Sequence, residues 1–177
     1  AGARLVGLRC RNDSVHVTGG PRFDQVASRA RGIAGARELL DPLQSDRLTL
    51  VAGSTWPSDE RVWLAAVADP RVRETGLRLI IAPHEPTPSH LAPIEQWAVE
   101  RRLRYARITD SDAGAAEVLV VDRLGVLGDI YALGDIAFVG GGFHAAGLHS
   151  VLEPASYGVP VLFGHQHSNS RDAALLI

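Results

Sequence analysis

Short apolar runs alternate along most of the chain with segments in which apolar residues recur at helical spacing. The runs are continuous rather than alternating, which is typical of strands that are covered on both faces. They predict strands at 47–54, 77–83, 103–109, 117–122, 135–141 and 159–164. The periodic segments predict helices at 58–69, 89–102, 125–134 and 151–158, and a last helix that begins near Ser168.

This alternation of strand and helix predicts an α/β fold, with a Rossmann-like open parallel sheet and helices on both faces. The segments outside this alternation are shorter or less regular. Residues 14–19 alternate like a short strand that ends in a turn, and residues 23–33 predict a short helix. Residues 37–47 are polar and interrupted by proline, which predicts a connector, and residues 110–115 predict a loop.

The composition limits the number of domains, the binding partners and the cellular compartment that can be expected for this fold. The 177 residues are enough for one domain with a real core, and the net charge of −2 gives no electrostatic reason to bind nucleic acid or an anionic membrane. The single cysteine, Cys10, cannot form an internal disulfide and fits a reducing compartment. The chain contains no methionine and stops within a segment of helical pattern, so we expect a fragment of a longer protein that is soluble alone.

The residues that follow the predicted strands carry the candidate chemistry, because ligands of such sheets bind beyond the carboxyl ends of the strands. These positions are rich in glycine and polar side chains, which predicts a binding crevice at one edge of the sheet. They are Gly53, Ser54, Thr55, Pro83, His84, Glu85, Asp122, Gly125, Gly140, Gly141, Gly142, Gly164, His165, Gln166 and His167.

The glycine run at 140–142 and the segment after it favour a phosphate-bearing ligand. Glycine lets the backbone approach a ligand closely, and a helix beginning near His149 and Ser150 would direct N–H groups toward an anion. Glu153, one turn into that helix, would accept hydrogen bonds from a ribose diol. The plainer alternative stays open, in which the glycines only form a turn and Glu153 only complements the helix dipole.

Two other kinds of site fit the sequence less well. The glycine run is not a GxGxxG fingerprint, which argues against a dinucleotide-binding domain for NAD. The four nearby histidines lack the spacing of metal ligands on a helix and no cysteine joins them, so no metal is expected; they are His144, His149, His165 and His167.

Several motifs in one order resemble those of the bacterial 3-deoxy-D-manno-octulosonic acid (Kdo) transferases. Residues 147–154 read GLHSVLEP and are followed by GVPV at 158–161 and by Asn169. VHVTGGPRFD at 15–24, VAGSTWPSDE at 51–60, IIAPHEP at 80–86 and VVDRLGVLGDIYALGDIAFVGG at 120–141 also match the family in order and spacing. The resemblance runs from Val15 to the end of the chain.

The resemblance implies the C-terminal, donor-binding half of a GT-B glycosyltransferase, an architecture of two Rossmann-like halves. Residues 1–22 would then be the tail of the N-terminal half or a linker, and 23–177 the nucleotide-sugar-binding domain. The parent enzyme would transfer Kdo from CMP-Kdo to a lipid A precursor in lipopolysaccharide biosynthesis, with inversion and without metal or cofactor. The catalytic base, the acceptor and the contact with the cytoplasmic face of the bacterial inner membrane would belong to the N-terminal half, so this chain alone would be inactive.

The same resemblance implies a role for individual donor-binding residues. Ser54 and Thr55 would face the phosphate or sugar, Pro83 and His84 would flank the cytosine, and the loop of Asp122, Arg123 and Gly125 would lie beside the base. Gly141, Gly142, His149 and Ser150 would cradle the phosphate, Glu153 would hold the ribose, and Asn169 would reach the Kdo side. Ser150 and His165 depart from the family, which has Asn and Pro more often at these positions, and PHEP at 83–86 lacks an arginine of one family form.

Two alternatives are weighed against this assignment. A GT-B glycosyltransferase or epimerase that uses a UDP-sugar would also carry a glutamate near Gly-x-Pro-Val, but HSVLEP at 149–154 and GST at 53–55 count against it. A non-catalytic nucleotide-binding module is the other alternative. Preferential binding of CMP, or of UMP and UDP, would separate the Kdo transferase from the UDP-sugar enzyme.

Overall fold

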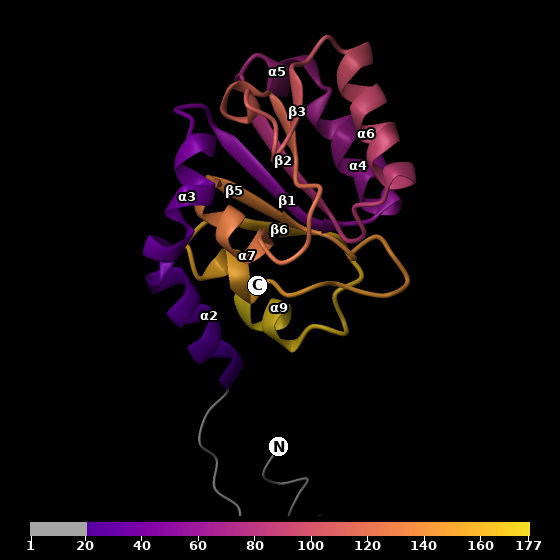
Figure 1. The fold of residues 1–177 in the computed structure, drawn as a ribbon. Coiled ribbons are helices and arrows are strands. Elements are labelled where there is room, and N and C mark those ends of the chain that lie inside the picture. Colours follow the sequence, from indigo (N-terminus) through magenta and orange to yellow (C-terminus); the bar gives the residue numbers. More distant parts are fainter. Residues whose placement is uncertain (1–20) are drawn as a thin grey trace, which may run out of the picture.

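Six strands form one all-parallel sheet in the order β3-β4-β2-β1-β5-β6 (Figure 1). The computed structural model describes residues 21–177, so Cys10, the predicted strand at 14–19 and the motif residues before Pro21 lie outside the described residues. The strands are β1 (Thr49–Thr55), β2 (Arg78–Pro83), β3 (Tyr105–Arg107), β4 (Val118–Val120), β5 (Ile136–Val139) and β6 (Val161–Phe163). All six strand predictions and the Rossmann-like fold class are confirmed.

Helices cover both faces of the sheet, as the continuous apolar runs predicted. Successive strand residues alternate between two cores, so Leu50 and Ile81 pack on one face while Val51 and Ile80 pack on the other. The first core lies under α4 (Pro57–Val67) and α6 (Pro88–Glu100), which run side by side in Figure 1. The second lies under α3 (Arg37–Leu40), the 3-10 helix η3 (Asp41–Leu43), α7 (Leu127–Ile130) and η5 (Tyr131–Leu133).

Short helices complete the described chain. The helix predicted at 23–33 is confirmed as α2 (Pro21–Arg31), which is followed by η2 (Ile33–Ala36). The helix predicted at 125–134 is divided into α7 and η5, and the last helix is α9 (Arg171–Leu176). A short α5 (Pro70–Arg73), capped by the Asp69 side chain, was not predicted. The predicted loop at 110–115 contains η4 (Ala113–Ala115), and α8 (Leu152–Ala155) is the shortened form of the helix predicted at 151–158.

The segment predicted as a polar connector at 37–47 is instead partly helical and belongs to the core. Leu40 and Leu43 are buried there. The cause is Arg78, a fully buried residue whose guanidinium donates hydrogen bonds to the carbonyl oxygens of Leu43 (2.6 Å), Ala113 (3.2 Å) and Ala116 (3.2 Å). This arginine ties the connector to β2 and to the loop before β4, and burial lowers its pKa from the ordinary value.

The sheet has its topological switch point between β1 and β5. From β1 the chain moves outward through β2 to β3 and β4, and then returns to pair β5 with the free side of β1. The loops after β1 and β5 therefore leave the sheet in opposite directions and open a crevice at their carboxyl ends. This edge of the sheet carries most of the predicted site residues.

Candidate functional site

The glycine run after β5 lies directly against the end of β1. The Gly140 N–H donates to the Gly53 carbonyl oxygen (2.9 Å), and a methyl group on Gly140 would collide with the Ser54 backbone. A methyl group on Gly141 would likewise collide with the Gly147 carbonyl oxygen, and Gly141 has a φ of +93°. Ser54 also has a positive φ, +53°, which is uncommon for a residue with a side chain. Backbone packing thus requires glycine at this loop.

A buried carboxylate fixes the shape of the glycine loop. Asp59, in the first turn of α4 and fully buried, accepts hydrogen bonds from the backbone N–H groups of Gly141 (2.8 Å), Phe143 (2.9 Å) and Trp56 (3.0 Å). The loop N–H groups of Gly140, Gly141 and Phe143 are therefore used within the protein. The glycine loop therefore does not present these three N–H groups as free donors, which differs from the simplest picture of a phosphate cradle.

Three imidazole rings surround the Trp56 indole at this edge. The ring of His144 stacks on the indole at 4.0 Å between centroids with an interplanar angle of 1°, and His84 stacks on it at 4.5 Å and 27°. His149 lies 4.6 Å from His84 and accepts a hydrogen bond at Nε2 from Trp56 Nε1 (3.2 Å). Loops that follow β1, β2 and β5 thus meet in one aromatic cluster, composed of Trp56, His84, His144 and His149.

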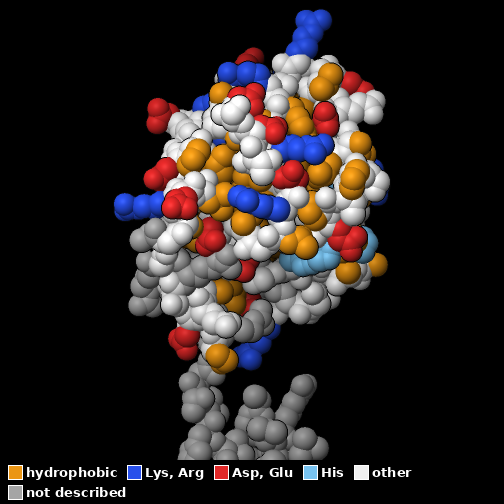
Figure 2. Space-filling model, viewed as in Figure 1, with side chains coloured by type: hydrophobic (Ala, Val, Ile, Leu, Met, Phe, Trp, Pro, Cys, Tyr) orange, Lys and Arg blue, Asp and Glu red, His pale blue; other side chains and the backbone are white. Residues whose placement is uncertain are grey.

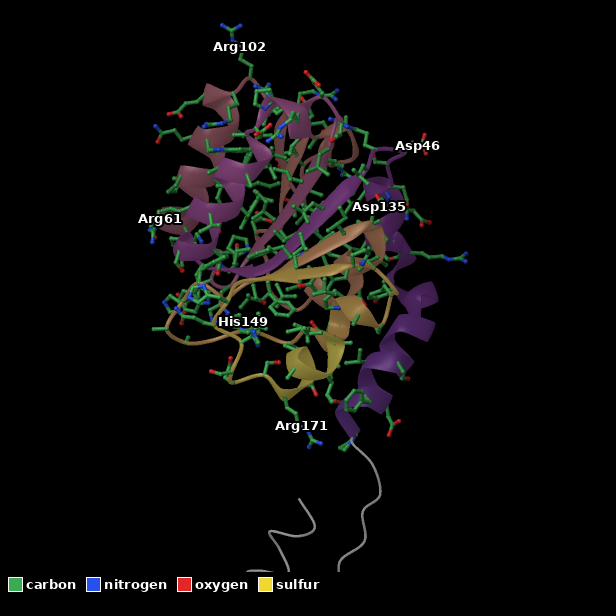
Figure 3. The ribbon with its side chains drawn as sticks, turned by 180° about the vertical axis from the view of Figure 1, so that it is seen from behind. Asp46, Arg61, Arg102, Asp135, His149 and Arg171 are labelled. Atoms are coloured by element: carbon green, nitrogen blue, oxygen red, sulfur yellow. The ribbon has the colours of Figure 1, made fainter. Side chains whose placement is uncertain are left out.

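The aromatic cluster favours an uncharged His149. Burial lowers the pKa of His149, the neighbouring His84 and His144 lower it further, and Asp59 raises it by a smaller amount. His149 lies beneath the carboxyl ends of the central strands (Figure 3). Arg102, which follows the C-terminal end of α6, lies far from it. Figure 2 shows histidine side chains reaching the surface below the layer of α4 and α6.

Glu153 is half-buried in α8, a helix that contacts η5. Its charge, after burial, raises the pKa of the Tyr131 hydroxyl, so the two groups lie close together. Tyr131 packs over Gly53, where a methyl group would collide with its ring and hydroxyl. Because α8 contacts η5, Glu153 lies on a helix next to Tyr131, the residue that packs over the end of β1.

The helix predicted to begin near His149 and Ser150 begins later, at Leu152. The Asn169 amide holds the preceding segment in a loop, because its Oδ1 accepts from the Leu148 N–H (3.0 Å) and its Nδ2 donates to the Leu148 carbonyl (2.9 Å). The His149 N–H donates to the Gly140 carbonyl (3.1 Å). Ser150 is exposed, and the Asn169 amide is engaged with the backbone, while the contacts predicted for both with the donor remain predictions.

Thr55 is part of a buried polar network behind the crevice. Its side chain is fully buried, and its hydroxyl donates to Glu60 Oε1 (2.7 Å), which also lies 3.0 Å from His90 Nε2. The hydrogen bond with Glu60 raises the pKa of His90, although burial opposes this effect. The structure thus joins the end of β1 to α4 and α6, and places the Thr55 hydroxyl away from the crevice surface.

The His90–Glu60 pair predicts a pH-dependent contribution to stability. Because the pKa of His90 is raised in the folded chain, its contribution is complete below the ordinary value of 6.5 and is lost as the pH rises through the folded pKa. We expect His90→Gln to lower the unfolding free energy by roughly 1.5–3 kcal/mol at about pH 6, and by less at about pH 9. Urea unfolding measures this, with His165→Gln as an exposed control, and a loss that grows with pH would contradict it.

Asp122, Arg123 and Gly125 follow β4, which lies on the far side of β2 from β1. Asp122 Oδ1 is buried and has no hydrogen-bond partner within residues 21–177. Arg123 is exposed and borders a hollow of about 340 Å³ that also touches Glu38, Asp110 and Ser111. These residues lie at the same edge of the sheet as the aromatic cluster but further along it, and the role predicted for them beside the base remains a prediction.

Other hollows lie away from the crevice. One of about 440 Å³ lies between α4 and α6 and is bordered by Leu64, Trp97 and Arg101, and a smaller one of about 100 Å³ shares Trp97 and Arg101. Neither of these two hollows borders the glycine loop, although apolar atoms form more of their walls than polar atoms do. The site at the switch point is identified by its hydrogen bonds and ring contacts.

Sequence reasoning missed three residues of this site. Asp59 was not predicted as a site residue, and its hydrogen bonds to Gly141 and Phe143 span a sequence separation that no local pattern reveals. Trp56 and His144 were not predicted as site residues. The signal for Trp56 was its position directly after Ser54 and Thr55 at a strand end, where this type of fold binds ligands.

No helix between residues 21 and 177 is both long enough and apolar enough to cross a bilayer. The same part of the chain contains no group of three or more His, Cys, Asp or Glu side chains arranged to hold a metal ion.

The fold and the site define a Rossmann-like α/β domain with polar residues at its switch point, and known proteins resemble this chain in sequence and in fold. The chain is 33% identical over 171 residues to a 3-deoxy-D-manno-octulosonic acid transferase of Chlamydia trachomatis, covering 91% of the chain and 37% of that protein. It is 30% identical to the transferase of Aquifex aeolicus, over 65% of the chain and 31% of that protein. No family model matches the chain.

Two further similarities extend the comparison. A bifunctional glycosyltransferase/methyltransferase of Fusobacterium nucleatum is 35% identical over 73% of the chain and 20% of its own length. The crystal structure of the C-terminal CMP-Kdo binding domain of WaaA from Acinetobacter baumannii has a TM-score of 0.63 at 24% identity, covering 85% of the chain and 76% of that domain, which shows the shared fold. The chain belongs to the Kdo transferase family and spans about a third of the length of the transferases it matches.

Proposed function

We propose that the chain is the donor-binding domain of a Kdo transferase and binds the cytidine nucleotide of CMP-Kdo in the crevice at the ends of β1 and β5. The observation that carries the proposal is that the glycine loop and His149 lie together at the topological switch point, while α8, which carries Glu153, contacts η5 beside the end of β1. The similarity to Kdo transferases and to a CMP-Kdo binding domain supports it.

Each group has a chemical task in this proposal. The Glu153 carboxylate accepts hydrogen bonds from the ribose diol, and His149 donates one to the phosphate from its ring. The glycine loop gives the phosphate close access to the backbone, and the position of His84 beside Trp56 offers a ring face to the cytosine. Pro83, Asp122, Arg123 and Gly125 border the base, while Ser54, Ser150 and Asn169 lie toward the phosphate and the Kdo.

The remaining steps of the reaction belong to the rest of the whole protein in this proposal. That part supplies the catalytic base, binds the lipid A precursor and contacts the inner membrane. Transfer inverts the anomeric centre and uses no metal or cofactor. The chain alone would bind the donor without transferring Kdo.

Titration calorimetry of the chain with CMP tests the proposal, with UMP, UDP and NADH as comparisons. We expect weak binding of CMP and no measurable binding of the other three nucleotides. Binding of UMP or UDP at equal or higher affinity would contradict the assignment of cytidine and would favour a UDP-sugar donor. Absence of CMP binding both in this chain and in the whole protein would contradict the proposed function itself.

A further inference from the structure

The hydrogen bond between Trp56 and His149 restricts where the imidazole can carry its proton. The indole Nε1–H is only a donor, so His149 Nε2, 3.2 Å away, must act as the acceptor. A neutral imidazole that accepts at Nε2 carries its proton at Nδ1. A doubly protonated imidazole has no acceptor and would break this hydrogen bond.

The Trp56 indole is held in place from several directions. His144 and His84 stack on the indole at 4.0 Å and 4.5 Å. Its backbone N–H donates to Asp59, and Pro57 begins α4 immediately after it. The indole therefore presents its N–H in a fixed direction, and the protonation of the His149 ring is determined by that donor.

The other edge of the His149 ring is left for a ligand. A methyl group on Gly141 would lie 3.2 Å from His149 Cδ2, so the ring edge formed by Cδ2 and Nε2 contacts the glycine loop and Trp56. Nδ1 lies on the opposite edge of the ring and has no hydrogen-bond partner among the described residues. The residue is half-buried, and its contacts with the glycine loop and Trp56 are made by the edge opposite Nδ1.

We propose that Trp56 is a positioning residue that holds His149 as the neutral Nδ1–H tautomer, so that Nδ1 offers a hydrogen-bond donor to the anionic group of the bound nucleotide. The ligand part of this inference rests on the proposed function, whereas the tautomer does not. The charged and titratable groups that face His149 are His84 after β2, His144 after β5 and Asp59 on α4. His84 and His144 oppose a charge on His149, and burial acts in the same direction, which agrees with a neutral ring.

Long-range ¹H–¹⁵N spectra of the histidine-labelled, ligand-free chain read this tautomer directly. In the native chain we expect the His149 signals of the Nδ1–H form. Trp56→Phe keeps an aromatic ring between His84 and His144 but removes the N–H donor, so His149 should change to the Nε2–H form and should titrate at a higher pH. Trp97→Phe is the matched control, because Trp97 lies on α6 against Arg101, and it should leave the His149 signals unchanged.

The outcomes separate the two parts of the inference. An Nε2–H form in the native chain, or an unchanged tautomer in Trp56→Phe, overturns the role of Trp56; the native spectrum alone decides if the variant does not fold. For the ligand, we expect Trp56→Phe to weaken CMP binding roughly three- to tenfold. A changed tautomer with unchanged CMP affinity overturns the donor role of His149, whereas a native chain that binds no CMP contradicts the proposed function and leaves the tautomer result standing.

Discussion

Asp59→Ala is expected to lower the free energy of unfolding by roughly 3–5 kcal/mol and to abolish nucleotide binding. The substitution removes the acceptor for the backbone N–H groups of Gly141, Phe143 and Trp56, and the buried position leaves them little access to water. The glycine loop would lose its hydrogen bonds to α4, and the first turn of α4 would lose the hydrogen bond from Trp56 N–H. Urea unfolding at neutral pH measures the stability, and calorimetry with CMP measures the binding.

Two control variants accompany Asp59→Ala: a conservative substitution at the same position and the removal of a distant, exposed carboxylate. Asp59→Asn keeps one acceptor oxygen but directs an NH₂ group at a backbone N–H, so its loss of stability should be substantial but smaller. Asp46→Ala removes an exposed carboxylate that points away from the molecule in Figure 3, and it should change the unfolding free energy by less than about 0.5 kcal/mol. A loss below about 1 kcal/mol for Asp59→Ala would show that the carboxylate does not organise the loop.

Gly142→Ala is expected to lower the free energy of unfolding by roughly 2–4 kcal/mol. A methyl group at this position would collide with the backbone N, Cα and O atoms of Gly164, and backbone atoms cannot turn aside as a flexible side chain can. The two glycines hold the loop after β6 against the loop after β5, and Gln166 N–H donates to the Gly142 carbonyl there (2.9 Å). The same unfolding experiment measures the effect.

Gly35→Ala provides the matched control for Gly142→Ala. Gly35 lies in η2, and a methyl group there would meet no atom within 4 Å. It should therefore be neutral or slightly stabilising, since alanine reduces the freedom of the unfolded chain. Equal stability of the two variants would mean that the loops after β5 and β6 are not closely packed.

The sheet was predictable because its strands are buried on both faces and are therefore continuous apolar runs, such as LRLIIAP. The connector at 37–47 was predicted wrongly because its order depends on Arg78, a distant residue whose guanidinium donates a hydrogen bond to the Leu43 carbonyl oxygen. A charged side chain that is completely buried reverses the usual expectation for arginine, and no local pattern indicates it. The core positions of Leu40 and Leu43 follow from that contact.

The crevice was predictable in its position but only partly in its construction. Residues after strands can be identified from a sequence, which is how Ser54, His84 and Gly141 were selected, whereas His149 was selected from the segment that follows the glycine run. The hydrogen bonds of Asp59 and the stacking of Trp56 join segments far apart in the chain, and these depend on the register of β1 against β5. The same limit applies to α8, whose start is set by the contact of Asn169 with Leu148.

The central claim is that Glu153 holds the nucleotide in the crevice at the ends of β1 and β5, and one comparison tests it most directly. CMP is titrated calorimetrically into the native chain, into Glu153→Ala and into Glu100→Ala, which removes an exposed carboxylate at the far end of α6. We predict that Glu153→Ala loses roughly 1.5–3 kcal/mol of binding free energy and that Glu100→Ala binds as the native chain does. Equal CMP affinity in all three chains would contradict the account, because the nucleotide would then bind elsewhere.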